Sequence, residues 1–345
     1  MRAHRKAAAG CALLLALATA GCSGRDGTTD AAGAAPSGSA APSTAARGTS
    51  YAPYVSATTA SATDAAGSPA AYNLAFVISA GDDCDPRWNG VQEIGDTAVA
   101  SRVAALKESG AAVRVSFGGA SGRELAATCG SASALAAAYG EALDAAGATR
   151  ADFDIEGDEL TDAASVALRS EAIALLQEER SGLEVSFTLP VMPSGLDAAS
   201  LALLTSANDH GVQVSTVNLM TMNYGESYDG DMGAYALTSA KAAHTQLRKV
   251  FGTSEADAWR GMALTSMPGV NDVAGETFTL EDAAEVRAFA EENGVAWVSM
   301  WATFRDRPCD GDTSSDDALT DCSGVDQEDG DFAQAFAGQR AQRRR

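Results

Sequence analysis

The chain has 345 residues, 46% of them hydrophobic, and a formal net charge of −22 at pH 7. Nucleic acids and anionic membrane surfaces would repel so acidic a protein, so we expect neither as a partner. The charge suits a protein that handles a neutral or cationic substrate.

The first 22 residues predict export from the cell. Basic residues precede the apolar run 12–20, which is too short to cross a membrane and is followed by Gly21 and Cys22. This ending resembles a bacterial lipoprotein signal, in which Cys22 becomes the lipidated first residue. Thr19 stands where such signals more often carry Leu, so ordinary secretion stays open. We expect an extracellular protein, either secreted or anchored to the outer face of a bacterial cell membrane.

Two further segments differ in composition from the rest of the chain. Residues 23–47 are rich in Ala, Ser, Thr and Gly and predict a disordered linker, because they cannot bury enough apolar surface to offset the entropy of ordering. Residues 339–345 form a basic tail that we expect to be frayed. The remaining residues, 48–338, suit one large α/β domain.

Four cysteines lie in this domain. In an oxidising compartment an even number suggests two disulfides, for which three pairings are possible. We favour Cys84–Cys129 and Cys309–Cys322, because each pair joins loops that lie near one another in the fold expected below. Metal binding by these cysteines is disfavoured, since the sequence has no Cys-x-x-Cys spacing.

Apolar, β-rich runs alternate with Ala-rich helical stretches throughout the domain. The expected strands are Tyr51–Ser56, Asn73–Ser79, Ala112–Phe117, Ala151–Glu156, Leu183–Leu189, Thr216–Met222, Arg260–Thr265 and Ala296–Trp301. The helical patterns between them include Ala98–Ser109, Ser131–Ala146, Asp162–Glu179, Ser239–Val250 and Leu280–Asn293. This alternation predicts a single (β/α)8 TIM barrel. A doubly wound sheet also alternates, but no Gly-x-Gly-x-x-Gly follows an early strand.

Three acids, Asp152, Asp154 and Glu156, alternate with apolar residues in the fourth expected strand, so their carboxylates share one face. Like charges at this spacing repel, so we expect at least one acid to hold a proton near neutral pH, as a catalytic acid must. A solvated edge strand is the structural alternative. A calcium loop is disfavoured, because the twelfth residue counted from the first acid is Ala163 and not Glu.

Unusual residues also gather at the ends of other expected strands, which is where the active site of such a barrel lies. Each has a structural alternative: the glycines could form a plain turn, Met222 could fill the core, and Trp301 could plug the barrel. Their joint occurrence favours a catalytic site. These residues are Ser116, Gly118 and Gly119 at the end of the third strand, Met222, Asn223 and Tyr224 at the sixth, and Trp301 at the eighth.

The same residues resemble the motifs of glycoside hydrolase family 18, the chitinases and related endo-β-N-acetylglucosaminidases. The likeness covers nearly the whole domain in chain order. The matching motifs are Ser116-x-Gly118-Gly119, Asp152-x-Asp154-x-Glu156, Met222-x-Tyr224 and Trp301.

The chain departs from the family pattern at several positions. Thr149 and Arg150 stand where the full signature has Asp and Gly, and Asn223 and Gly225 stand where Asp is common. None of these changes removes the acid Glu156, so they bear on rate and pH optimum more than on the type of reaction.

The resemblance implies retaining, substrate-assisted hydrolysis, in which the N-acetyl oxygen of the substrate is the nucleophile and an oxazolinium ion forms. It implies that Glu156 is the general acid, that Asp154 binds the acetamido N–H, and that Asp152 shares a proton with Asp154. Tyr224 would hold the acetamido carbonyl oxygen, and Trp301 would form an apolar floor beneath the sugar. No metal or organic cofactor is implied.

The resemblance implies that the remaining motif residues support the site. Met222 and Ser116 would pack or bond around the acids, beside Asn223, Gly118 and Gly119.

About 30 residues separate the seventh and eighth expected strands, too few for an inserted domain, which predicts an open groove and endo-type cleavage. We also expect a monomer. Chitin or chito-oligosaccharides are the favoured substrates. Two alternatives stay open: the same chemistry on N-linked glycans or peptidoglycan, and a non-catalytic sugar-binding protein on the same barrel. The intact Glu156 argues against the second alternative, whereas Asn223 and the possible lipid anchor favour it.

Overall fold

The computed structural model describes residues 48–311 and 321–339. The expected signal peptide with Cys22, the linker 23–47 and residues 340–345 of the basic tail lie outside the described residues. None of the helices in the described part combines the length and the apolar character that a bilayer crossing requires.

The main sheet is mostly parallel, and its strand order is β1-β13-β10-β9-β8-β7-β6-β3-β4-β5, with β2 paired to β3. Its strands are β1 (Ser50–Tyr51), β2 (Tyr54–Ser56), β3 (Ala71–Ser79), β4 (Pro86–Trp88), β5 (Gln92–Glu93), β6 (Ala112–Gly118), β7 (Arg150–Asp154), β8 (Glu184–Pro190), β9 (Val214–Met220), β10 (Met262–Ser266) and β13 (Trp297–Met300). A separate hairpin pairs β11 (Gly269–Val270) with β12 (Thr277–Phe278).

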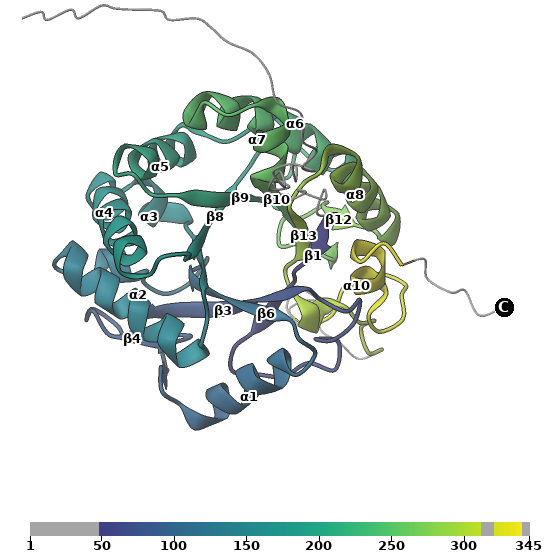
Figure 1. Cartoon of the computed structure of the whole chain (residues 1–345). Helices are drawn as coiled ribbons and strands as arrows, with labels where there is room; N and C mark the ends of the chain where they lie inside the picture. Colours follow the sequence, from purple (N-terminus) through teal and green to yellow (C-terminus); the bar gives the residue numbers. More distant parts are fainter. Residues whose placement is uncertain (1–47, 312–320, 340–345) are drawn as a thin grey trace, which may run out of the picture. The chain divides into compact units, whose positions relative to one another are not determined.

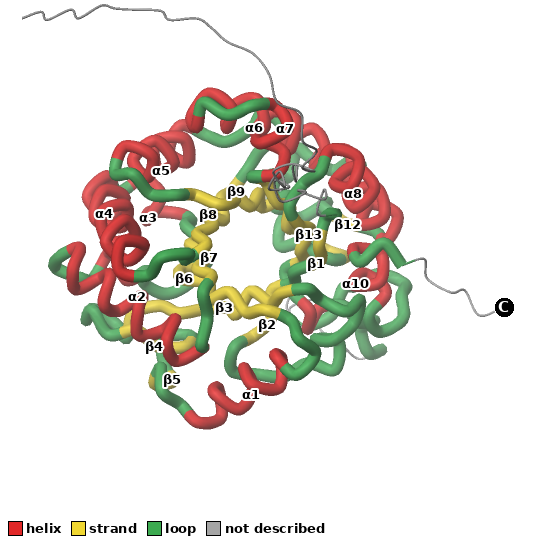
Figure 2. Tube along the Cα trace, viewed as in Figure 1, coloured by secondary structure: helices red, strands yellow, loops and turns green. Residues whose placement is uncertain are grey.

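Helices follow most of the parallel strands and lie outside them, around the strands at the centre of Figures 1 and 2. The α-helices are α1 (Thr97–Lys107), α2 (Ala132–Ala146), α3 (Gly157–Thr161), α4 (Ala163–Glu179), α5 (Ala198–Asp209), α6 (Met232–Phe251), α7 (Glu255–Arg260), α8 (Leu280–Asn293) and α10 (Asp331–Phe336). The 3-10 helices among the described residues are η1 (Leu125–Ala127) and η2 (Thr303–Arg305).

The first expected strand forms as two short strands on either side of Ala52 and Pro53. Proline has no N–H to donate, so it interrupts the ladder. β1 pairs with β13, whereas β2 pairs with β3. One stretch of chain therefore hydrogen-bonds to strands from both ends of the sequence.

Other boundaries also differ from expectation. The fourth strand, β7, ends at Asp154, and Glu156 lies just beyond it at the start of α3, still with extended backbone angles. Helix α6 begins at Met232, because Asp231 caps it by accepting the N–H of Ala234. The sequence patterns did not include α5, whose Ala-rich stretch begins at the capping residue Asp197.

The apolar residues of β7 face the helices and leave the opposite face to the acids. Phe153 packs between Phe117 of β6 and Phe187 of β8, with ring centroids 5.3 and 5.7 Å away. Tyr139 of α2 covers it at 5.0 Å. Because β7 pairs with strands on both sides, the solvated edge-strand alternative is wrong.

Both expected disulfides are present. Cys84–Cys129 joins the loop after β3 to the loop after η1, and Cys309–Cys322 joins two segments between η2 and α10. The favoured pairing of the four cysteines is therefore confirmed.

Candidate active site

Asp152 is fully buried and accepts hydrogen bonds from four hydroxyl groups. Tyr54 and Ser116 donate to its Oδ2 at 2.9 and 2.7 Å. Ser186 and Thr188 donate to its Oδ1 at 2.7 and 2.9 Å. An ionised carboxylate only accepts, so this set of donors is matched to its charged form.

An amide beside these donors bonds to two of them. Asn218 of β9 donates from Nδ2 to the hydroxyl oxygens of Tyr54 and Thr188, at 3.3 and 3.0 Å. Its Oδ1 in turn accepts from Thr265 of β10 at 2.9 Å. These two hydroxyl oxygens also lie 2.8 Å from each other, so Tyr54, Thr188, Asn218 and Asp152 form one buried network.

Asp154, one step along the same face, has no such set of donors. Burial, together with the charges of Glu156 and Asp152, raises its pKa well above the ordinary range. Its Oδ1 is buried without a hydrogen-bond partner among the described residues. The Asp154 carboxyl forms its side-chain hydrogen bond with Glu156. The structure thus pairs Asp154 with Glu156, and the expected sharing of a proton between Asp152 and Asp154 stays a prediction.

Glu156 lies at the pocket with a pKa raised to about 7. Burial is the main cause, the hydrogen bond to Asp154 opposes it, and the charge of Asp272 adds to it. A carboxyl group with this pKa holds its proton up to near-neutral pH and loses it as the pH rises through about 7. It can therefore serve first as an acid and then as a base.

Asp154 and Glu156 line a pocket with a strongly aromatic wall. Trp301 stacks on Phe76 with ring centroids 5.3 Å apart and meets the edge of Tyr54 at 5.7 Å. The pocket is lined by Tyr54, Phe76, Ala120, Asp154, Glu156, Thr188, Met220, Met222, Asn223, Thr265, Asp272 and Trp301. An apolar wall beside convergent carboxyl groups is the arrangement expected of a sugar-binding site.

The glycines at the end of β6 allow close backbone approach. A Cβ on Gly118, whose φ is +98°, would lie 2.2 Å from the carbonyl oxygen of Asp154. One on Gly119 would meet the Phe76 ring at 2.7 Å, while its N–H donates to Asp154 O at 2.9 Å. Both glycines therefore support the pocket wall through their backbone.

Tyr224 is the expected catalytic residue that the structure does not bring to the acids. Its hydroxyl lies 3.5 Å from Ser239 of α6, and the side chain is buried, so its pKa is raised by burial. The positive φ of Asn223 (+56°) and Gly225 (+113°) breaks the strand alternation and turns Tyr224 towards the helix. The side chains of Met220 and Met222 line the pocket at this point.

Sequence reasoning missed Tyr54, Thr188 and Asp272 as site residues. The first two are ordinary strand residues in the sequence, and only the pairing of β2 and β8 with their neighbours brings them to the acids. Asp272 comes from the β11–β12 hairpin, and no periodic pattern in the sequence predicts this hairpin.

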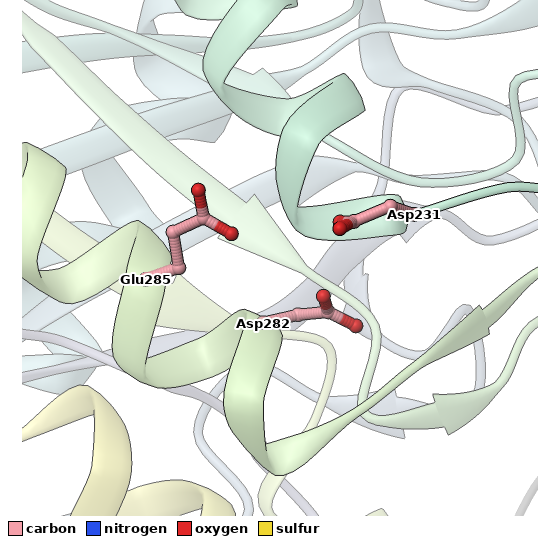
Figure 3. Close-up of side chains that lie close together, drawn as sticks. All are labelled: Asp231, Asp282 and Glu285. Carbon is pink, nitrogen blue, oxygen red and sulfur yellow. The ribbon is translucent and has the colours of Figure 1, made fainter.

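A second group of acids lies away from the pocket. Oxygen atoms of Asp231, Asp282 and Glu285 approach within 4.8 Å at the starts of α6 and α8 (Figure 3). Asp231 caps α6, and Asp282 forms a capping box with Thr279. Helix capping accounts for these two carboxylates, and we assign no metal to the group.

No family model matches the chain. It is 34% identical over 277 residues to a protein of Escherichia coli named probable bifunctional chitinase/lysozyme, a match that covers 75% of this chain but 31% of that protein. The chain thus spans about a third of the length of this relative.

Solved structures give the same likeness over a whole domain. Catalytic-site mutants of active domain 2 of the Pyrococcus furiosus chitinase, complexed with chito-oligosaccharides, match with a TM-score of 0.73 and 28% identity, covering 85% of this chain and 94% of theirs. A GH18 chitinase from Pseudoalteromonas aurantia matches in fold, with a TM-score of 0.55 and 12% identity over 74% of this chain and 94% of its own. The resemblance read from the motifs is confirmed.

Removing the Tyr54 hydroxyl should destabilise the protein, because Asp152 loses one of its charged hydrogen bonds. We expect Tyr54→Phe to lower the free energy of unfolding by about 1.5–3 kcal/mol in urea denaturation. Tyr51 is the matched control: it is also buried, but its hydroxyl has no hydrogen-bond partner among the described residues. Tyr51→Phe should cost nothing, and equal losses in both variants would contradict the role given to Tyr54.

Neutralising Asp272 should lower the pKa of Glu156, because it removes a neighbouring negative charge. We expect Glu156 to titrate near 7 in the wild type and at lower pH in Asp272→Asn, as followed by ¹³C NMR of labelled glutamate carboxyls. Glu141→Gln removes the same charge from the exposed surface of α2 and should leave this titration in place. An unchanged Glu156 titration in Asp272→Asn would refute the coupling.

Proposed function

We propose that the chain, which resembles glycoside hydrolase family 18 in its motifs and in its similarity to chitinases, hydrolyses β-1,4-linked N-acetylglucosamine in chitin or chito-oligosaccharides. The observation that carries the proposal is the Glu156–Asp154 pair at the aromatic pocket, with the pKa of Glu156 raised to about 7 and that of Asp154 also raised well above its ordinary value. The related domain complexed with chito-oligosaccharides supports this choice of substrate.

The proposed reaction retains the anomeric configuration. Glu156 gives its proton to the glycosidic oxygen, while the acetamido carbonyl oxygen of the substrate forms a bond to the anomeric carbon and the glycosidic bond breaks. The unpartnered Oδ1 of Asp154 is a ready acceptor for the acetamido N–H, which gains positive character as the oxazolinium ion forms. Glu156, now a carboxylate, takes a proton from the water that opens this ion.

We further propose that the domain is a closed eight-stranded barrel without an inserted domain between β10 and β13. The pairings of β1 with β13 and of β2 with β3 support closure. Between β10 and β13 the chain forms the β11–β12 hairpin and α8. This architecture favours an open groove and endo-type cleavage by a monomer.

Peptidoglycan is the second candidate substrate. The Escherichia coli relative carries both chitinase and lysozyme in its name, and peptidoglycan also contains N-acetylglucosamine. The substrate-assisted chemistry requires only the N-acetyl group at the cleaved sugar. The retained Glu156 supports an enzyme over a sugar-binding protein.

We propose that the protein is exported and lipidated at Cys22, and this rests on the sequence of residues 1–22 alone. Expression in a bacterial host with a lipoprotein pathway should place the wild type in the membrane fraction, with a lipid mass on its first peptide. Cys22→Ser should release it to the soluble exported fraction. Wild type found soluble, without added mass, would contradict lipidation.

Replacing the acid should abolish hydrolysis without abolishing binding. We expect Glu156→Gln to cleave N-acetyl-chitotetraose and chitohexaose about 100- to 10,000-fold more slowly than the wild type, because general acid–base catalysis is lost. Asp158→Asn removes a charge two residues away at the exposed start of α3 and should keep its activity. Initial wild-type products should be β-anomers by NMR.

The outcomes separate the candidates. Wild type that cleaves peptidoglycan but no chito-oligosaccharide would select the second substrate. Wild type that binds the oligomers and cleaves neither substrate across pH 4 to 8 would rule out the enzyme and favour a sugar-binding protein. α-Anomeric initial products would exclude the substrate-assisted mechanism.

A further inference from the structure

Glu276 is a buried acid that the proposed reaction does not use. It lies at the end of the turn between β11 and β12, is 1% exposed, and does not line the pocket. Its Oε1 accepts the backbone N–H of Gly225 at 2.8 Å, and its Oε2 has no partner among the described residues. A carboxylate placed here costs free energy through desolvation, so its surroundings should compensate for the charge.

The compensation comes from the loop after β9. Burial raises the pKa of Glu276, whereas hydrogen bonds from the backbone N–H groups of Gly225, Asn223 and Tyr224 act in the opposite direction by stabilising its charge. Asn223 and Gly225 have φ values of +56° and +113°. Successive N–H groups converge on one anion in turns that include left-handed residues. The loop after β9 is thus shaped around the Glu276 carboxylate.

The hairpin that carries Glu276 is held on its other side. Within it, Asn271 N donates to Glu276 O at 3.0 Å. Val270 N donates to Ser323 O at 2.7 Å, and Arg305 Nη2 donates to Val270 O at 2.6 Å. Ser323 follows the disulfide residue Cys322. These hydrogen bonds therefore hold in place the hairpin that carries Glu276.

Both segments joined by Glu276 place a side chain beside the catalytic acid. Asn223 and Asp272 both line the pocket, and Asn223 Nδ2 lies 3.3 Å from Asp272 Oδ2. One residue belongs to the loop after β9 and the other to the hairpin. Their contact, and the position of the Asp272 charge relative to Glu156, therefore depend on how these two segments are joined.

We propose that Glu276 is a positioning residue, which locks the loop 223–225 to the hairpin 271–276 and so fixes Asn223 and Asp272 beside Glu156. This role rests on the proposed function, since it concerns the same acid. It predicts more than a structural contribution: loss of the lock should change the titration of Glu156 as well as the stability of the protein.

The test compares Glu276→Ala with Asp306→Ala in the full chain. Asp306 is the matched control, because it is also a buried carboxylate that accepts two backbone N–H groups, those of Phe332 and Ala333, at 3.0 and 2.8 Å. It holds the start of α10 and does not line the pocket. Both variants should be less stable than the wild type. Glu276→Gln keeps one acceptor oxygen and should lie between wild type and Glu276→Ala.

Hydrogen exchange is the first measurement, because it needs no activity. We expect the amides of residues 223–225 to exchange about tenfold faster or more in Glu276→Ala, since their acceptor is gone. They should keep the wild-type rate in Asp306→Ala. Unchanged exchange at 223–225 in Glu276→Ala would overturn the proposal, even if the wild type hydrolysed no substrate.

The pH profile of kcat/KM on chitohexaose is the second measurement. The titratable groups that face Glu156 are Asp154 from β7, Asp272 from the hairpin and Tyr54 from β2, and Arg305 faces Asp272 in turn. When the lock is lost, Asp272 is held less firmly and water enters the pocket, and both changes lower the pKa of Glu156. The alkaline limb should move to lower pH in Glu276→Ala and stay in place in Asp306→Ala.

The two measurements distinguish failure of the proposed function from failure of the positioning role of Glu276. An inactive wild type defeats the proposed function, while the exchange data still decide whether Glu276 locks the loop. If exchange rises in Glu276→Ala but its alkaline limb coincides with that of Asp306→Ala, then Glu276 is structural only and the positioning role is lost.

Discussion

The four hydroxyl groups around the Asp152 carboxylate are the interaction on which the rest of the site depends. An unpaired charge at this depth would cost several kcal/mol. The donors come from β2, β6 and β8, so the charge is compensated only when these strands hold their registers around β7. In the ladder, Ser116 and Ser186 stand directly opposite Asp152. A slip of one residue would turn these hydroxyls to the other face.

The charge of Asp152 is compensated by its four hydroxyl donors. Asp154 and Glu156 have no such donors in the part of the chain that the structure describes, so the free-energy cost of burying a charge falls on these two acids. Asp154 has a buried oxygen without a partner among the described residues, and Glu156 is half-buried beside the charge of Asp272. The pKa values of Asp154 and Glu156 are both raised, whereas the hydroxyl groups are arranged around Asp152 alone. Strand β7 and the residue that caps α3 thus carry three carboxyl groups in different environments. The difference arises from what the neighbouring strands donate at each level and not from the acids themselves.

Because the neighbouring strands determine the environment of each acid, the sequence could predict only part of the site. The alternation of acidic and apolar residues with a period of two placed the three acids on one face, because strand alternation depends only on local backbone geometry. The chain's alternation of strands and helices likewise indicated the sheet, and loop proximity indicated both disulfides. Tyr54 and Thr188 could not be found, since a hydroxyl in a strand has no signature until partner strands are known. Tyr224 was misplaced because its side chain follows the left-handed backbone at Asn223, which alternation does not describe.

The left-handed backbone at position 223 also gives a physical reason for the presence of Asn there. The resemblance to the family places Asn where Asp is common, which suggests a lost charge. Here Asn223 adopts a φ of +56°, a conformation that Asn tolerates, and its amide lies 3.3 Å from the Asp272 carboxylate. An Asp at this position would face Asp272 as a second anion and repel it. The negative charge beside Glu156 is therefore supplied from the hairpin, and a neutral donor at 223 is what allows Asp272 to lie there.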